Sequence, residues 1–251
     1  MRLIESLKAV IPGEVKALVM SGRAYWRNRR SPRTVFSDIY ADNLWGGSGD
    51  EPFSGAGSRG IAAVAYVECV QSFIEAQSIR TVVDLGCGDF YIGKQIAQVC
   101  EGYVGVDVVP RVVQRNAAHF SNDRVRFTCL DIVKDCLPAG DLCLLRQVLQ
   151  HLSNVQIGKV LRNVARYRQV IITEHYPPDG QVVARNVDKV PSADTRLSVG
   201  SAVYLADPPF SLSNLELLLE CRLPENPDNT TPAYKAGVIR SFLWRPGFSA
   251  S

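Results

Sequence analysis

Short apolar runs recur along the middle of the chain and are separated by segments with helical spacing. The runs are rich in Val, Ile and Leu with little polar alternation, and five of them cover residues 80–86, 102–109, 124–132, 141–149 and 169–175. Continuous apolar strands of this kind are typical of a parallel sheet that is covered on both faces. The pattern therefore predicts an α/β fold with a doubly wound, mostly parallel sheet.

Amphipathic segments between the runs predict the covering helices. Their apolar residues recur every three or four positions in residues 61–75, 91–100, 111–120 and 154–167. Right-handed crossovers then place the loops that follow the strands at one edge of the sheet. Ligands bind at this edge in folds of this class.

The last third of the chain is less regular. Residues 176–210 are rich in Pro, Asp and Ser, and loops of this length inside a domain are often lids or binding loops. We expect a short helix near Leu212 to Leu219 and two final strands near residues 217–223 and 236–245. With these two strands, the predicted sheet has seven strands.

The first 54 residues differ in composition from the rest. Between Met1 and Phe36 there are eight basic and two acidic residues, although the whole chain carries a net charge of only +3. A basic helical arm with apolar residues can contact an anionic membrane surface, or pack on the domain or on a second subunit of a homodimer. Residues 45–58 are dense in Gly and Ser, and we expect them to cover the site, with a simple linker as the alternative. We divide the chain into residues 1–54, the arm with its cover loop, and residues 55–251, the α/β domain.

Composition also indicates which cellular compartment and which class of partner are favoured. No apolar stretch reaches the roughly 18 to 20 residues of a membrane-spanning helix, and Met1 to Met20 lacks the pattern of a secretory signal. The seven cysteines are scattered and form no C-x-x-C pair, which favours reduced thiols in the cytoplasm over a zinc site. The body of the chain has no second basic stripe, so nucleic acid is not favoured as a partner.

The stretch TVVDLGCGDFYIG, residues 81–93, joins the first strand to a glycine loop. Gly86 and Gly88 match the start of the dinucleotide fingerprint G-x-G-x-x-G, but the third position is Tyr91. A pyrophosphate would also face the carboxylates of Asp84 and Asp89, which repel it. S-adenosylmethionine has no phosphate and carries an ammonium and a sulfonium, so the same carboxylates attract it. The loop favours S-adenosylmethionine, with an NAD-dependent oxidoreductase as the alternative.

Acidic residues at two further strand ends fit the same cofactor. Asp107 lies 21 positions after Gly86, where a carboxylate can accept hydrogen bonds from both ribose hydroxyls. Asp131 follows the third strand, where it can accept from an adenine amino group while Ile132 packs on the ring. The predicted cofactor residues are Asp84, Gly86, Cys87, Gly88, Asp107, Val108, Asp131, Ile132, Arg146 and Gln147.

The motifs VVDLGCGDF, VGVDVV, LDI and DLCLLRQVLQHLS resemble those of class I (Rossmann-like) S-adenosylmethionine-dependent methyltransferases over residues 55–175. Phe90 replaces the third motif glycine, a substitution common in this class. The segments FSDIYADNLWGGSGDEPFSGAGS, QHLS and DPPFSL are similar to a bacterial group often associated with polysaccharide and glycoconjugate assembly. This narrower resemblance implies glycan modification, with a sugar hydroxyl as the methyl acceptor.

Three residues at strand ends are candidates for catalysis. An alcohol acceptor needs a general base, and His151 follows the fourth strand at the edge where the methyl group is expected. Its structural alternative is to help cap the next helix. Glu174 and His175 end the fifth strand and are further candidates for a base or for acceptor binding. We expect no metal at these residues, since their spacing is not that of a ligand set.

Residues 176–210 are expected to bind a small-molecule or glycoconjugate acceptor. The polar side chains expected to contact it are Asp179, Arg185, Asn186, Asp188, Asp194 and Arg196. Such a mixture suits a polyol, whose hydrogen bonds must be replaced when it leaves water. A non-catalytic binding protein that keeps the fold remains the alternative to an enzyme.

Overall fold

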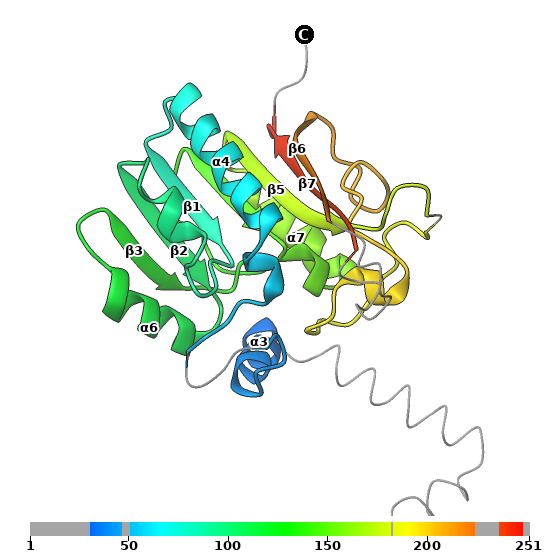
Figure 1. Cartoon of the computed structure of the whole chain (residues 1–251), viewed down its shortest axis with the longest axis horizontal. Coiled ribbons are helices and arrows are strands. Elements are labelled where there is room, and N and C mark those ends of the chain that lie inside the picture. Colours follow the sequence, from blue (N-terminus) through cyan, green and yellow to red (C-terminus); the bar gives the residue numbers. More distant parts are fainter. Residues whose placement is uncertain (1–30, 47–50, 182, 224–235, 248–251) are drawn as a thin grey trace, which may run out of the picture. The chain divides into compact units, whose positions relative to one another are not determined.

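The computed structural model describes residues 31–46, 51–181, 183–223 and 236–247 (Figure 1). The chain divides into two compact units, Met1–Ser31 and Pro32–Ser251, and every element described below belongs to the second. Residues 1–30 of the predicted basic arm lie outside the described residues.

A seven-stranded sheet in the order β3-β2-β1-β4-β5-β7-β6 forms the centre of the second unit. The parallel strands are β1 (Thr81–Leu85), β2 (Gly102–Asp107), β3 (Val125–Cys129), β4 (Leu142–Arg146) and β5 (Gln169–Tyr176). At the other side β7 (Gly237–Trp244) runs antiparallel between β5 and β6 (Leu215–Leu223). The predicted doubly wound, mostly parallel, seven-stranded α/β fold is confirmed.

Helices cover both faces because side chains alternate along each buried strand. Val83, Leu145 and Ile172 pack with α6 (Pro110–Phe120) and α7 (Asn154–Val164) on one face. Val82, Leu144 and Ile171 pack with α4 (Ile61–Ala76) and the short α5 (Gly93–Ile96) on the other. These two apolar layers fix the sheet.

A further helix, α3 (Pro32–Ala41), lies beyond the carboxyl ends of the parallel strands (Figure 1). Its buried residues Val35, Phe36, Ile39 and Tyr40 belong to the same apolar cluster as α6 and α7. The helix therefore closes the edge of the sheet at which the predicted site residues meet.

Two helix predictions differ from the structure. The helix expected near Leu212 to Leu219 is wrong, because β6 occupies residues 215–223 and pairs along its length with β7. Its run of leucines fits either periodicity, and pairing with a neighbouring strand decides the outcome. The helix predicted at 91–100 ends at Ile96, since the chain must turn back to start β2 at Gly102.

The long segment between β5 and β6 contains one short 3₁₀ turn, η3 (Arg196–Val199), and is held by buried polar groups. The Asn186 side chain donates to the carbonyl oxygens of Tyr204 and Pro208, both at 2.9 Å, and accepts from the Tyr204 amide at 2.8 Å. Arg196 is fully buried and donates to backbone carbonyls of Val187 and, at 2.8 Å, of Leu152. Buried backbone groups need such partners where there is no regular ladder.

Replacement of Asn186 tests this account. Asn186→Ala removes one acceptor and three donor contacts and leaves buried backbone groups unpaired, so the free energy of unfolding should fall by about 2 to 4 kcal/mol. The control is Arg185→Ala, which breaks an exposed ion pair with Asp207 and should change the free energy of unfolding much less. Urea unfolding of both variants measures the difference, and equal losses would contradict the role given to Asn186.

Candidate functional site

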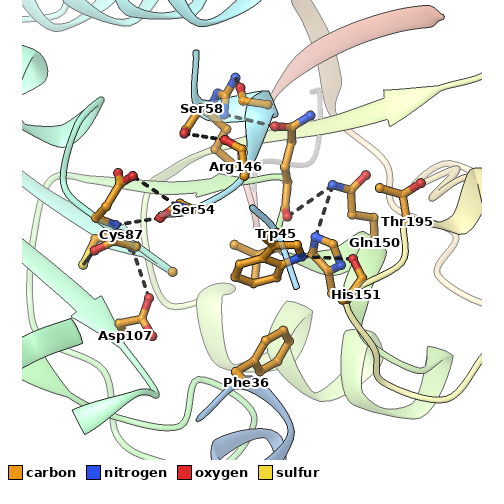
Figure 2. A pocket seen from close by; sticks show the side chains of 18 of the residues that line it. Phe36, Trp45, Ser54, Ser58, Cys87, Asp107, Arg146, Gln150, His151 and Thr195 are labelled. Carbon is orange, nitrogen blue, oxygen red and sulfur yellow. Dashed lines mark hydrogen bonds between the residues drawn. The ribbon is translucent and has the colours of Figure 1, made fainter. Parts of the chain in front are cut away.

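One cavity of about 740 Å³ lies at the carboxyl ends of the parallel strands (Figure 2). Its volume falls in the range of roughly 300 to 1,000 Å³ that is usual for ligand sites. In the sheet, β1 has β2 on one side and β4 on the other. The cavity lies at the end of β1, which is the switch point of this open α/β sheet. The predicted site residues that line it are Asp84, Gly86, Cys87, Gly88, Asp107, Val108, Asp131, Ile132, Arg146, Gln147, His151 and His175. Glu174 is not among the lining residues.

The glycine loop after β1 requires glycine at two positions. Gly86 has φ of 80°, and a Cβ there would lie 2.5 Å from a methyl group of Val148. Gly88 has φ of 53°, and a Cβ there would lie 2.1 Å from the Ser54 hydroxyl. The left-handed backbone and the close approach of neighbouring segments both exclude larger residues. The backbone of this loop therefore borders the cavity directly.

Asp107 holds the glycine loop from the neighbouring strand. One carboxylate oxygen accepts from the Gly88 amide at 3.1 Å, and the other accepts from the Val109 amide at 3.0 Å. Burial raises the pKa of Asp107, and these backbone hydrogen bonds act in the opposite direction. Each oxygen has a second acceptor position. The carboxylate can therefore receive a pair of neighbouring hydroxyl groups from a ligand.

Two other carboxylates line the cavity in different surroundings. Asp84 accepts a hydrogen bond from the Tyr103 hydroxyl, and burial raises its pKa to about 6. Asp131 is 3% exposed and accepts from the Val133 amide at 3.1 Å. Both side chains keep oxygen positions for a ligand, one beside the glycine loop and one after β3.

Several polar atoms on the cavity wall are buried without a protein partner. They include the Tyr66 hydroxyl, the Gln150 amide oxygen and the Thr195 hydroxyl. Arg146 lies with its guanidinium 5.1 Å from the centre of the Tyr66 ring and donates to the Gly57 carbonyl at 2.7 Å. Unpartnered buried polar atoms are rare and call for an explanation. A ligand with hydrogen-bonding groups offers partners of the required kinds.

His151 lies in the short turn η2 (Leu149–His151) with its ring against an aromatic wall (Figure 2). The ring centroid is 5.3 Å from that of Trp45 and 6.4 Å from that of Phe36. Its Nδ1 lies 3.2 Å from the Ser192 carbonyl oxygen, so Nδ1 carries the proton and Nε2 carries the lone pair. Burial, with a smaller effect of Lys189, lowers the pKa of His151 to about 4. The imidazole is neutral at physiological pH.

The other two catalytic candidates have different surroundings. Glu174 is 1% exposed, and its carboxylate accepts from the backbone amides of Leu149 at 2.9 Å and Gln150 at 3.1 Å. It therefore holds the turn that carries His151 and is not directed at the cavity. His175 lines the cavity, but its Nε2 lies 3.1 Å from the Ala236 carbonyl oxygen, and burial lowers its pKa.

The acceptor wall predicted from residues 176–210 is largely wrong. Of its six polar candidates, only Asp194 lines the cavity, together with Ala193, Thr195 and Ser198 of the same segment. The others bond to the protein itself: Asp179 pairs with Arg222 and Arg240 at the surface, for example. In a long irregular segment, backbone groups need hydrogen-bond partners and charged groups need counter-charges. Most of the polar side chains of this segment serve these purposes.

Aromatic side chains from the N-terminal part of the unit form the wall instead. Phe36 and Tyr40 of α3 and Trp45 line the cavity, and the Trp45 indole donates to the Ala193 carbonyl at 3.1 Å. No sequence pattern nominated Phe36 or Tyr40, because a helix preceding the sheet carries no signal of the edge on which it packs.

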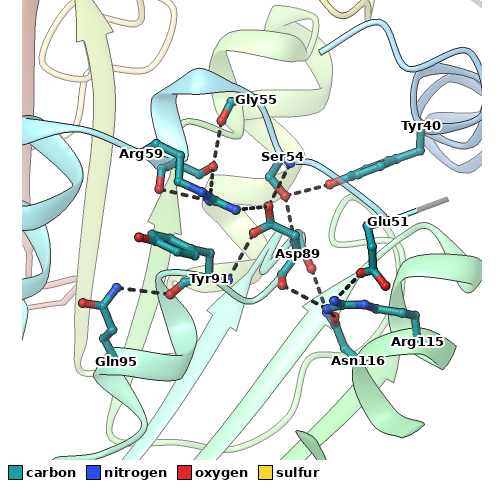
Figure 3. A network of polar contacts seen from close by, with 12 residues as sticks. Tyr40, Glu51, Ser54, Gly55, Arg59, Asp89, Tyr91, Gln95, Arg115 and Asn116 are labelled. Atoms are coloured by element: carbon teal, nitrogen blue, oxygen red, sulfur yellow. Dashed lines mark hydrogen bonds and ion pairs between the residues drawn. The ribbon is translucent and has the colours of Figure 1, made fainter. Parts of the chain in front are cut away.

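The described part of the glycine-rich segment 45–58 is tied to the glycine loop by a polar network (Figure 3). Asp89 accepts from the Ser54 amide and from Arg59, both at 3.1 Å, and its own amide donates to the Ser54 hydroxyl at 2.7 Å. The Tyr40 hydroxyl lies 3.0 Å from the same Ser54 oxygen. Asp89 is therefore engaged by the segment rather than by a ligand, and residues 54–58 line the cavity.

None of the described helices is long and apolar enough to cross a membrane. Within the same part of the chain, no group of three or more His, Cys, Asp or Glu side chains is placed to hold a metal ion.

The network predicts that Asp89 clasps the segment onto the glycine loop. Asp89→Ala removes the acceptor for Ser54 and Arg59, so cleavage within residues 45–58 by a nonspecific protease should become faster. Glu51→Gln is the matched control, because it alters an exposed ion pair of the same segment with Arg115. Limited proteolysis with mass spectrometry compares the two, and an unchanged cleavage rate in the Asp89 variant would refute the clasp.

Comparison with known proteins agrees with this geometry. A family model described as a methyltransferase domain matches residues 82–169, from β1 to the start of β5. No curated protein matches the sequence. Among solved structures, the chain is similar to the N-methyltransferase NodS from Bradyrhizobium japonicum WM9 in complex with S-adenosyl-L-homocysteine. That match has a TM-score of 0.60 and 13% identity, and covers 85% of this chain and 100% of that chain.

A second similar structure is human N-acetylserotonin methyltransferase in complex with S-adenosylmethionine. It has a TM-score of 0.49 and 16% identity, with 72% of this chain and 52% of that chain covered. At 13% identity, the likeness to NodS shows a shared fold, and the family match adds the class of domain. The findings therefore show a segment that matches a methyltransferase domain, residues 82–169, within a fold that the chain shares with NodS.

Proposed function

We propose that the protein methylates a hydroxyl group of a sugar-containing small molecule or glycoconjugate, with His151 as the general base. The observation that carries this proposal is the neutral, buried imidazole of His151, whose Nδ1 is held by Ser192 and whose Nε2 is left as the basic atom. An amine acceptor has its own lone pair, whereas an alcohol gains from a positioned base. Seven free thiols support a reducing compartment such as the cytoplasm.

Strand-end residues that line the cavity are assigned to different parts of the cofactor. Asp107 receives the ribose hydroxyls, while Asp131 and Ile132 receive the adenine. Asp84 lies beside the glycine loop, where its carboxylate attracts the ammonium of the methionine part. Bound S-adenosylmethionine supplies a methyl group that its sulfonium already activates. The remaining work of the chain is to position the acceptor, exclude water and take up a proton.

A weak base is sufficient for this reaction. The hydroxyl proton becomes strongly acidic only as the new carbon–oxygen bond forms, so the base need not remove it beforehand. His151 meets this requirement, because a pKa of about 4 keeps Nε2 unprotonated at neutral pH. The Ser192 carbonyl then stabilises the tautomer before the proton transfer and the imidazolium after it.

Glu174 is a positioning residue in this proposal. Its carboxylate accepts from the backbone amides at positions 149 and 150 and fixes the turn, and it does not contact the acceptor. His175 also lines the cavity. Its Nε2 bonds to the Ala236 carbonyl oxygen, so we assign this residue to shaping the cavity and not to catalysis.

Two alternatives are distinguished by direct measurement. Methylation of an amine would proceed without His151, and a binding protein that keeps the fold would form no S-adenosylhomocysteine with any acceptor. The apolar surface of Trp45 beside polar groups favours a sugar, which presents both C–H faces and hydroxyl edges.

Removal of the Asp107 carboxylate should weaken cofactor binding. Asp107→Ala deletes a charged acceptor, worth about 1.5 to 3 kcal/mol, so the affinity for S-adenosylmethionine should fall about 10- to 150-fold. Isothermal titration measures it, with NAD as a second ligand that should not bind. Because the same carboxylate holds Gly88 and Val109, urea unfolding must show that the variant is folded. Unchanged affinity in a folded variant would refute the ribose contact.

Removal of His151 should affect turnover rather than cofactor binding. His151→Ala should lower kcat about 10²- to 10⁴-fold while the affinity for S-adenosylhomocysteine stays within about twofold. In the wild type, a pKa lowered to about 4 means that protonation abolishes the base only as the pH falls towards 4. The rate of the chemical step should therefore be flat between about pH 6 and pH 8. Normal turnover of the variant would reduce His151 to a structural role.

A further inference from the structure

The turn η2 presents a second polar group to the cavity next to His151. Gln150 is 4% exposed and lines the cavity, and its amide oxygen has no hydrogen-bond partner in the protein. A buried acceptor without a donor is unfavourable unless a ligand supplies one. Figure 2 shows the Gln150 side chain extending from the same turn as the imidazole.

The orientation of the Gln150 amide is set by its other end. Its Nε2 donates to the Gln147 carbonyl at 3.4 Å and lies 3.5 Å from Nε2 of His151. A nitrogen is required opposite a carbonyl oxygen, so the amide oxygen is the end that is left without a protein partner. The contact with His151 is at the limit of hydrogen bonding, and a hydroxyl at an ordinary distance of about 2.8 Å displaces it.

A second unpartnered group comes from the segment that lies against His151. The buried hydroxyl of Thr195 has no partner in the protein and lines the same cavity. This segment is anchored at the site, because Ser192 accepts from the His151 ring and Ala193 accepts from Trp45. The same cavity therefore has three polar groups from this region: the basic nitrogen of His151, the acceptor oxygen of Gln150, and the hydroxyl of Thr195, which can donate and accept.

Charge next to the turn favours a neutral ligand. Lys189 donates to the Ser192 hydroxyl at 3.1 Å and to the Asp194 carbonyl at 3.0 Å, and its charge opposes protonation of His151. A neutral hydroxyl next to His151 adds no further positive charge beside this ammonium.

We infer that Gln150 and Thr195 form a subsite for a second hydroxyl, adjacent to the one that is methylated. The acceptor is then a vicinal diol of a sugar ring: one hydroxyl meets Nε2 of His151, and its neighbour donates to the Gln150 amide oxygen and contacts Thr195. This inference rests on the proposed O-methylation and adds the residues that determine specificity. Trp45 packs on the ring and leaves the hydroxyl edge to the polar side.

The test compares methyl hexopyranosides of gluco, galacto and manno configuration with their monodeoxy derivatives and with the matching amino sugars. S-adenosylhomocysteine formation gives kcat/KM, and mass spectrometry locates the new methyl group. The wild type should prefer the parent glycoside about 10- to 100-fold over the derivative that lacks the hydroxyl next to the methylated one, because that derivative leaves the subsite unpaired.

Near-isosteric variants assign the preference to the two side chains. Gln150→Leu and Thr195→Val should each reduce the preference to less than about threefold, whereas Thr195→Ser, which keeps the hydroxyl, should retain it. The affinity of Gln150→Leu for S-adenosylhomocysteine should match that of the wild type. A loss of that affinity would place the amide at the cofactor and overturn the inference.

The outcomes separate the inference from the proposed function. Equal methylation of parent and deoxy glycosides by the wild type would overturn the diol subsite and leave O-methylation standing. Methylation of the amino sugars at nitrogen alone would overturn both. Failure to methylate any glycoside would also overturn the inference, since the predicted class would not be a substrate.

Discussion

The hydrogen bond from the Gly88 amide to the Asp107 carboxylate is the constraint on which the site depends. It joins the loop after β1 to the end of β2 and fixes a left-handed turn that only glycine adopts without strain. The same turn leaves no room for a side chain between Gly88 and Ser54, so the covering segment rests directly on the loop. The positions of the glycine loop, of the end of β2 and of the segment that contains Ser54 thus depend on one another.

A second buried carboxylate, that of Glu174, has an equivalent role on the side of the cavity that we assign to the acceptor. Glu174 has little contact with solvent, and burial raises its pKa, while the two backbone amides of η2 and the nearby Arg196 oppose that rise. The first backbone amides of a helical turn lack partners within it, and a carboxylate that accepts two of them fixes the turn. The position of the His151 ring therefore depends on a residue that does not face the cavity.

The sequence was sufficient for the sheet and for the cofactor edge. Continuous runs of Val, Ile and Leu predict parallel strands, and the residues at their carboxyl ends then meet at one edge of the sheet. The residues that line one cavity at this edge include Asp84, Gly86, Asp107 and Asp131. The prediction failed where a role depends on tertiary direction. Glu174 and His175 are neighbours in one strand and point to opposite faces, so their sequence position could not tell which would line the cavity. The buried role of Arg196 depends on carbonyl groups of Leu152 and Val187, which no local pattern reveals.

In the proposed reaction, the acceptor side combines an aromatic wall with a neutral base, and the two features belong together. Transfer of a methyl group from a sulfonium to a neutral hydroxyl spreads a positive charge that already exists, and it creates no anion that would need strong solvation. An apolar enclosure formed by Phe36 and Trp45 therefore does not oppose the reaction in the way it would oppose formation of an alkoxide. The same enclosure lowers the pKa of His151, which keeps the imidazole neutral and prevents it from repelling the cationic cofactor. Burial of this histidine thus reduces its strength as a base and, by the same physical effect, makes the site compatible with its donor.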